Sequence, residues 1–119
     1  MSNPRNHRVF AMSFAVVYPL YLTKIKKKGR SKEELDAVVC WLTGFDPLEL
    51  AHHLAAGTTF TDLFAQARLH PDAARITGAV CGIRVEDVED PLMRKIRYLD
   101  KVVDELARGW ALERVLRQC

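Results

Sequence analysis

Apolar residues recur along this chain at intervals of three and four positions, the spacing that places them on one face of an α-helix. Proline follows Asp46, His70 and Asp90, where a first helical residue tolerates it, and the two aspartates are good N-caps. Stretches with this apolar spacing end at glycines, as expected for helix C-termini: Gly29, Gly44, Gly57, Gly82 and Gly109. These signals predict an all-α protein, a compact bundle of six or seven short helices.

The individual helices follow from the apolar periods between these signals. A capping box, Ser31 with Glu34, opens one of them. Pro19 must either kink the first helix or move its start to Tyr18. The longest helix, residues 91–107, has a narrow apolar seam, which we expect to organise the core or to form a dimer interface. The expected helices are residues 13–28, 31–43, 47–56, 60–67, 91–107 and 110–117.

Each of these helices is expected to bury one stripe of side chains, because the short connections force neighbouring helices together. The stripe of the second helix is Leu35, Val38, Val39 and Leu42. The third helix is expected to bury Leu48, Leu50 or Ala51, and Leu54. The seam of the longest helix is Leu92, Ile96, Leu99, Val103 and Leu106.

The stretch 72–81 is compatible with two structures. Ile76, Val80 and Ile83 suit either a helix or a brief strand, and Gly78 weakens both. We favour a helix, because residues 77–83 weakly repeat the pattern of residues 39–45. The alternative is a minor extended segment near residues 76–85.

Composition indicates one ordinary globular domain. The chain has 119 residues, of which 49% are hydrophobic, enough for one buried core. We expect a single helical domain over residues 9–119, preceded by a flexible basic arm over residues 1–8. The net charge of +3 conceals an asymmetry, because residues 1–32 carry eight basic side chains and no acidic one. Such a split indicates a surface that faces a polyanion, or an arm that meets an acidic surface.

The basic residues concentrate at the end of the first helix, in Lys24, Lys26, Lys27, Lys28 and Arg30. Cations at a helix C-terminus complement the macrodipole, so the cluster can simply be a solvated helix end. As a binding site it would contact several phosphates in a salt-sensitive manner. Residues 32–56 imitate a helix-turn-helix, but residues 48–56 contain no lysine or arginine to contact DNA.

Catalytic and metal sites have weaker support in the sequence. Cys40 and Cys81 could in principle form a metal site or a thiol–imidazole pair with His52 or His53. No two of these residues have the sequence spacing that is typical of metal ligands. Adjacent histidines on a helix point about 100° apart. Buried, inert cysteines are the simpler interpretation. We therefore expect no metal, no cofactor and no catalytic residue, and motifs typical of nucleotide binding and of hydrolases are absent.

The cellular setting is expected to be the cytoplasm. The longest apolar stretch, residues 9–22, is interrupted by Ser13 and Pro19 and is shorter than the roughly 20 residues of a membrane span. The three cysteines are far apart and odd in number, which suits reduced thiols. We expect no membrane association.

Several separated blocks resemble one bacterial family, domain of unknown function 2200, over about residues 7–117. The blocks are residues 12–15, 18–21, 40–44, 76–78, 81–82, 84–86, 90–93, 96–101 and 104–107. The resemblance implies no activity, cofactor or catalytic residue, since the family is uncharacterised.

These observations favour a non-enzymatic binding module of the bacterial cytoplasm. Its partner is a protein or a polyanion such as nucleic acid, and a homodimer through the longest helix or the apolar N-terminal segment is open. The alternative is a small enzyme whose active site is dispersed around His52, His53 and Cys40. A pocket with shifted pKa values around these residues or Tyr98 would favour that alternative.

Overall fold

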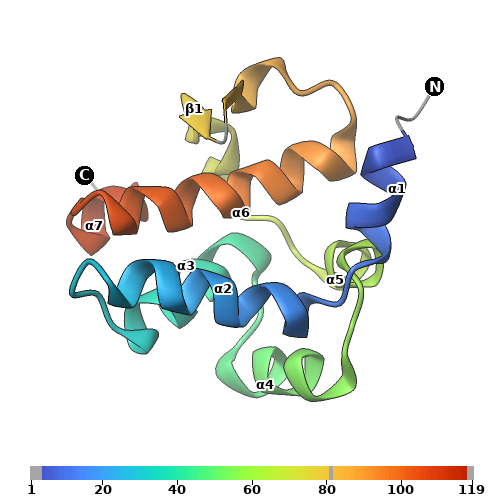
Figure 1. The fold of residues 1–119 in the computed structure, drawn as a ribbon, viewed down its shortest axis with the longest axis horizontal. Helices are drawn as coiled ribbons and strands as arrows, with labels where there is room; N and C mark the ends of the chain where they lie inside the picture. The colour runs from blue at the N-terminus through green and yellow to red at the C-terminus, as the bar shows by residue number, and fades with distance from the viewer. Residues whose placement is uncertain (1–3, 81, 118–119) are drawn as a thin grey trace.

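The computed structural model describes residues 4–80 and 82–117, which form a mostly helical, compact fold (Figure 1). The expected all-α bundle is confirmed at this level. The helices are α1 (Pro4–Ala11), α2 (Phe14–Lys26), α3 (Lys32–Thr43), α4 (Pro47–Ala56), α5 (Phe60–Gln66), α6 (Pro91–Ala107) and α7 (Leu112–Val115). Two 3-10 turns, η1 (Pro71–Arg75) and η2 (Val85–Asp87), and two short strands, β1 (Ala79–Val80) and β2 (Ile83–Arg84), separate α5 from α6.

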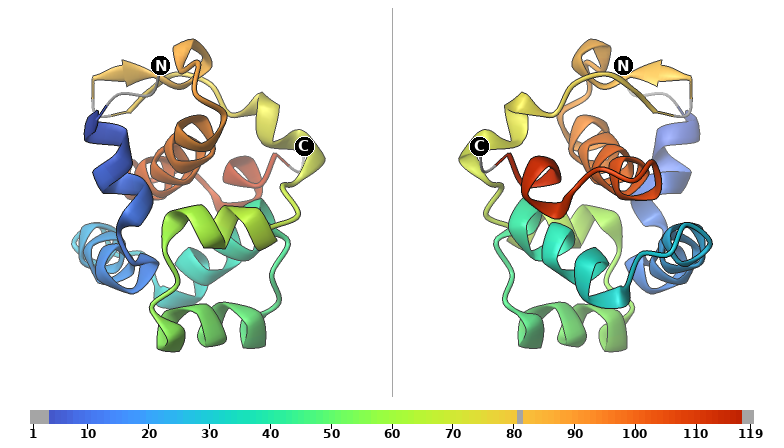
Figure 2. Two further views of the ribbon diagram at one scale, coloured as in Figure 1. Left: turned by 90° about the vertical axis from the view of Figure 1, so that its right-hand side faces the viewer. Right: turned by 90° about the vertical axis from the view of Figure 1, so that its left-hand side faces the viewer.

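Helix α6 is the centre of the fold, as its long apolar seam predicts. It packs against α1, α2, α3, α5, α7, β1 and η2. Figure 2 shows it nearly end-on, with α1 to one side and the β-hairpin above it. The seam lines the core, because Ile96, Leu99, Val103 and Leu106 are almost completely buried. Neighbouring positions, including Val102 and Glu105, are buried as well, so α6 is covered around most of its circumference.

Local signals set the helix ends where the sequence predicts them. The capping box Ser31–Glu34 opens α3, and a second one, Asp46–Glu49, opens α4. Gly44 ends α3 with φ of +76°, and a Cβ there would lie 2.7 Å from the carbonyl oxygen of Arg68, so only glycine fits. Leu35, Val38, Val39 and Leu42 are all buried, which confirms the stripe of α3.

Three expectations about the N-terminal half need correction or refinement. Helix α2 begins at Phe14, and Ser13 is its N-cap. Pro19 therefore lies inside the helix, on its exposed face. Leu48 was expected in the core but is 82% exposed, because His53 and Leu50 form the inward face of α4. Helix α1 was not expected. It takes in residues 4–8 of the predicted basic arm, while residues 1–3 lie outside the described residues.

The stretch 72–81 is not the favoured helix but close to the extended alternative. Residues 71–75 form a single 3-10 turn, and β1 pairs antiparallel with β2 through Ala79 with Arg84 and Val80 with Ile83. Gly78 has φ of +103°, a backbone conformation that a continuing helix of L-residues does not accommodate. The glycine therefore decides between two structures that the apolar pattern leaves open.

The last predicted helix is shorter than expected, since α7 spans Leu112–Val115 rather than residues 110–117. No helix in the described ranges is both long enough and apolar enough to span a membrane.

Candidate functional site

The C-terminal ends of α2 and α6 lie side by side. The two helices run parallel, because Tyr21 donates a hydrogen bond to Asp100 and, one turn further along both, Lys24 contacts Asp104 at 3.2 Å. In Figure 1 both helices run from the α1 end of the molecule toward α7. Two helix C-termini, each with its own basic residues, therefore meet at one place on the surface.

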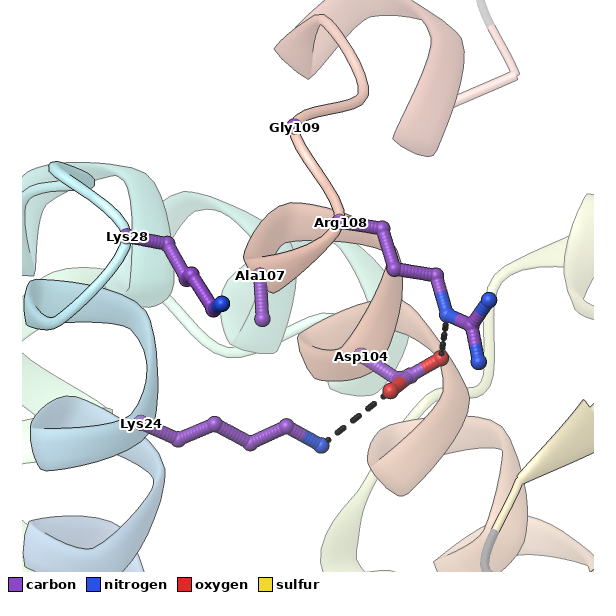
Figure 3. Close-up of a pocket in the computed structure, with 6 residues that line it drawn as sticks. All are labelled: Lys24, Lys28, Asp104, Ala107, Arg108 and Gly109. Atoms are coloured by element: carbon purple, nitrogen blue, oxygen red, sulfur yellow. Dashed lines mark hydrogen bonds and ion pairs between the residues drawn. The ribbon is translucent and has the colours of Figure 1, made fainter.

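An open groove of about 570 Å³ lies between these two helix ends. Lys24 and Lys28 of α2 and the connection after it face Asp104, Ala107, Arg108 and Gly109. Figure 3 shows Lys24 and Arg108 approaching Asp104 from opposite sides, with Lys28 reaching toward Ala107. The Arg108 Nε donates to Asp104 Oδ2 at 2.6 Å. The groove is thus lined by three cations and one carboxylate.

The carboxylate of Asp104 is held as an anion by its neighbours. Partial burial by itself would raise the pKa of Asp104, but hydrogen bonds and charges from Arg108 and Lys24 outweigh burial and lower it below its ordinary value of 3.8. Lys101 lies 3.9 Å from the same carboxylate. Three cationic side chains, Lys24, Lys101 and Arg108, therefore contact this one carboxylate. Lys28 adds a further positive charge to the groove, which keeps a net positive charge.

The residues predicted to bind anions separate into two groups. Lys24, Lys26, Lys27 and Lys28 are exposed at the end of α2, and Lys24 and Lys28 line the groove. Arg30 has a different environment, because its side chain is only 14% exposed and bonds within the protein.

Arg30 ties three parts of the chain together. Its Nε and Nη2 donate to the Glu34 carboxylate, and its Nη1 donates to the backbone oxygens of Leu106 at 3.2 Å and Trp110 at 2.6 Å. The hydrogen bond to Glu34 raises the pKa of Arg30 further. The guanidinium therefore satisfies carbonyl groups at the C-terminal end of α6, a structural task that occupies its donors.

Among the three cations that line the groove, Arg108 is the one that we did not single out in the sequence. Gly109 marks the end of the longest helix, so Arg108 stands at the end of α6 as the lysines stand at the end of α2. That position is the signal by which the residue can be found. Elsewhere on α6, Arg97 pairs with Asp100 at 3.1 Å. The carboxylate of Glu105 is taken by Arg117.

Cys40, His52 and His53 have different environments in the structure. Cys40 lies half-buried on α3, and burial raises the pKa of its thiol, which disfavours the reactive thiolate. His52 is exposed, whereas His53 is buried beside the Phe45 ring and hydrogen-bonds to Thr58. Burial lowers the pKa of His53.

Cys81 lies outside the described residues. Among the described ones, no group of three or more His, Cys, Asp and Glu side chains has an arrangement that would hold a metal ion.

Comparisons with known proteins identify the chain's relatives. A solved structure described as the uncharacterised protein SP1917 is 38% identical in sequence and superposes with a TM-score of 0.89, covering 98% of this chain and 96% of the other. No curated protein matches the sequence. The family described as uncharacterised protein conserved in bacteria, DUF2200, matches residues 8–117. The predicted resemblance is confirmed: the chain belongs to the bacterial family DUF2200.

Proposed function

We propose that the protein is a non-enzymatic module that binds polyanions at the joined ends of α2 and α6. The observation that carries the proposal is the groove in which Lys24, Lys28 and Arg108 face one another around a carboxylate that two of them already hold. Lys26 and Lys27 are exposed in the same lysine-rich stretch. A chain of phosphates spaced along a backbone matches several exposed cations better than a single small anion does.

The charge at this surface exceeds what the helix ends require. The C-termini of α2 and α6 carry partial negative charge, which one cation at each end is enough to complement. Lys27 and Arg108 occupy those C-cap positions. Lys24, Lys26 and Lys28 are additional, and the positive potential they add is the kind that attracts an extended polyanion.

Binding of this kind reads charge and not base sequence. Helix α4, the second helix of the apparent helix-turn-helix, contains no lysine or arginine and exposes Leu48 instead. Without lysine or arginine, this helix lacks the side chains that most often read guanine in the major groove of DNA. We therefore expect similar affinities for nucleic acids of different sequence. The three widely spaced cysteines, of which Cys40 is a free thiol, support a place in the bacterial cytoplasm.

The test is a fluorescence-anisotropy titration with short single- and double-stranded nucleic acids at about 50 and 200 mM salt. The variant K26Q/K27Q/K28Q removes three exposed charges and leaves the contacts of Lys24 with Asp104 in place. We expect its affinity at the lower salt to fall at least about tenfold. We also expect its binding to release about two to three fewer counterions, which makes the affinity depend less steeply on salt.

The matched control is R68Q/R75Q/R84Q, which removes the same charge from exposed side chains on other elements. This variant should bind nearly as the natural protein does. Equal losses in the two triple variants would show that only net charge matters, and a lack of binding at the lower salt would refute the polyanion proposal.

A second candidate function, self-association or binding of another protein, has its own observation. Val16 and Leu20 of α2, one helical turn apart, are 59% and 64% exposed, and Met12 continues this apolar stripe. Sedimentation velocity tests it, with L20D placed in the stripe and L48D as a control at the exposed Leu48 of α4. Dimers dissociated by L20D but not by L48D would establish the stripe as the interface.

A further inference from the structure

A second, smaller pocket of about 170 Å³ lies at the other end of α6. It is enclosed by α1, α2, α5 and the first half of α6, and Figure 1 shows α1 beside that end of α6. Its walls are mostly apolar and include Val9, Met12, Val17, Phe60, Met93 and Ile96. Phe60 and Ile96 are each only 2% exposed, so much of the wall belongs to the core.

Three polar side chains line one side of this pocket: Tyr21, Arg97 and Asp100. The Arg97 Nη1 contacts Asp100 Oδ2 at 3.1 Å, and the Asp100 carboxylate also accepts a hydrogen bond from the Tyr21 hydroxyl. The Nε of Arg97 is buried and has no hydrogen-bond partner within residues 4–80 and 82–117. Buried donors in folded proteins are nearly always satisfied, by protein, by water or by a ligand.

The charges in this pocket determine which ligand suits the free donor. Asp100 compensates the charge of the Arg97 guanidinium, so the pocket has little net charge, and Arg97 Nε is the buried donor for which the described residues provide no acceptor. A neutral carbonyl oxygen fits that donor, whereas a carboxylate would also face the negative charge of Asp100. The volume limits the size, because cavities of about 150 Å³ accommodate a molecule as large as benzene.

We propose that this pocket binds a small uncharged carbonyl compound, of about six non-hydrogen atoms, whose oxygen accepts a hydrogen bond from Arg97 Nε. The apolar body of the ligand packs against Val17, Phe60 and Met93. Specificity comes from combining a single buried donor with apolar walls, the usual composition of small-molecule sites. The site lies on α1, α2, α5 and the first half of α6, apart from the basic groove, so it does not depend on polyanion binding.

Methionine methyl groups provide a direct probe of occupancy. The chain has three methionines, and Met12 and Met93 both line the pocket. Protein labelled with ¹³C at the methionine methyl groups is titrated with cyclopentanone, benzene and butyrate, three probes with the same number of non-hydrogen atoms. We expect cyclopentanone to shift the Met12 and Met93 signals saturably, with about tenfold higher affinity than benzene or butyrate.

Two neighbouring valines of α2 supply matched variants. V17F fills the pocket from its wall, whereas V16F adds the same ring at an exposed position on the outer face of α2. Cyclopentanone should cause no saturable shift in V17F and an unchanged one in V16F. R97K retains a cation that can pair with Asp100 but lacks the Nε donor, so its affinity for cyclopentanone should fall to that for benzene.

Several outcomes would overturn the proposal. If no probe shifts Met12 and Met93 saturably, the pocket is not a ligand site. Equal binding of benzene and cyclopentanone would mean that the Arg97 donor takes no part. Tighter binding of butyrate would make the pocket an anion site and contradict the argument from Asp100.

Discussion

The two halves of helix α6 share one apolar seam but have different polar surroundings. In the second half, Asp104 contacts three cations, and the carboxylate of Glu105, fully buried, is held by Arg117 at 2.5 and 3.0 Å. In the first half, Arg97 pairs with Asp100, but its buried Nε has no partner among the described residues and lies beside a small pocket. The second half therefore has its buried charges paired beneath an open basic groove, whereas the first half has a buried donor for which the described residues provide no acceptor.

This difference teaches that polar satisfaction, and not hydrophobicity, distinguishes the two ends of the helix: the paired end offers a partner only its surface charge, whereas the other end offers a small ligand a buried donor. Buried charges that are fully paired contribute to a unique structure, whereas an unpaired donor beside a cavity is a point where another molecule can bind. The comparison can be tested by removing groups from each half in turn.

The largest effect is expected from E105A in the second half. This substitution leaves the Arg117 guanidinium without its carboxylate, and breaking a buried pair costs about 3–5 kcal/mol in the free energy of unfolding. Urea denaturation at neutral pH measures it. E113A, at an exposed glutamate of α7, should stay within about 0.5 kcal/mol. A loss below about 1 kcal/mol for E105A would contradict the view that this half depends on its paired buried charges.

A smaller loss of stability, about 2 kcal/mol, is expected from R30M. The substitution removes the hydrogen bonds that Arg30 makes to Glu34 and to the carbonyl oxygens of Leu106 and Trp110. R30K should recover little of the loss, because one ammonium group does not reproduce the guanidinium fork. K27M serves as the comparison at an exposed position. Full recovery in R30K would show that charge alone is needed.

The packing of the two halves can be compared by adding one methylene to each. V103I enlarges a side chain that is 1% exposed in the second half and should destabilise the protein by about 1–3 kcal/mol. V17I enlarges the wall of the pocket and should remain within about 0.5 kcal/mol of the natural protein, because the pocket provides space. Thermal denaturation of both variants measures the contrast, and equal losses would mean that the pocket does not relieve crowding.

The smallest effect is a dependence of stability on pH in the second half. The folded-state pKa of Asp104 lies below its ordinary value of 3.8, so its stabilising contribution is fully present above that pH and is lost as the pH falls through the folded-state pKa. The melting temperature of the natural protein should therefore drop more steeply in that acidic range than that of D104N. If the melting temperatures of the two proteins fell equally with pH, Asp104 would not be the group whose protonation destabilises the fold.

Much of the fold is predictable from the sequence, because helix ends depend on nearby residues. The capping boxes of α3 and α4 and the stop at Gly44 involve contacts over a few positions. The prediction fails where the apolar pattern supports two structures, as in residues 72–81, and where it does not show which face is inward, as at Leu48. Helix α1 was missed because its mean hydropathy is low and its contacts with α5 and α6 are distant in sequence.

The candidate site is predictable only in part. Four of the five predicted anion-binding residues are exposed, and Lys24 and Lys28 line the groove, because a helix C-terminus rich in lysine is a local feature. The fifth, Arg30, contacts residues 76 and 80 positions away, which no local pattern can indicate.

By itself, the sequence determined the helices from α2 to α5, helix α6 with its central seam, and most of their caps, since these follow from spacing and from contacts between close neighbours. Only the tertiary structure decided that α2 and α6 lie parallel, that Asp104 contacts Lys24 and Arg108, and that Arg97 has a buried donor for which residues 4–80 and 82–117 provide no acceptor. The reason is physical: the partner of a charged side chain depends on which helices become neighbours, and that is set by the packing of the whole core.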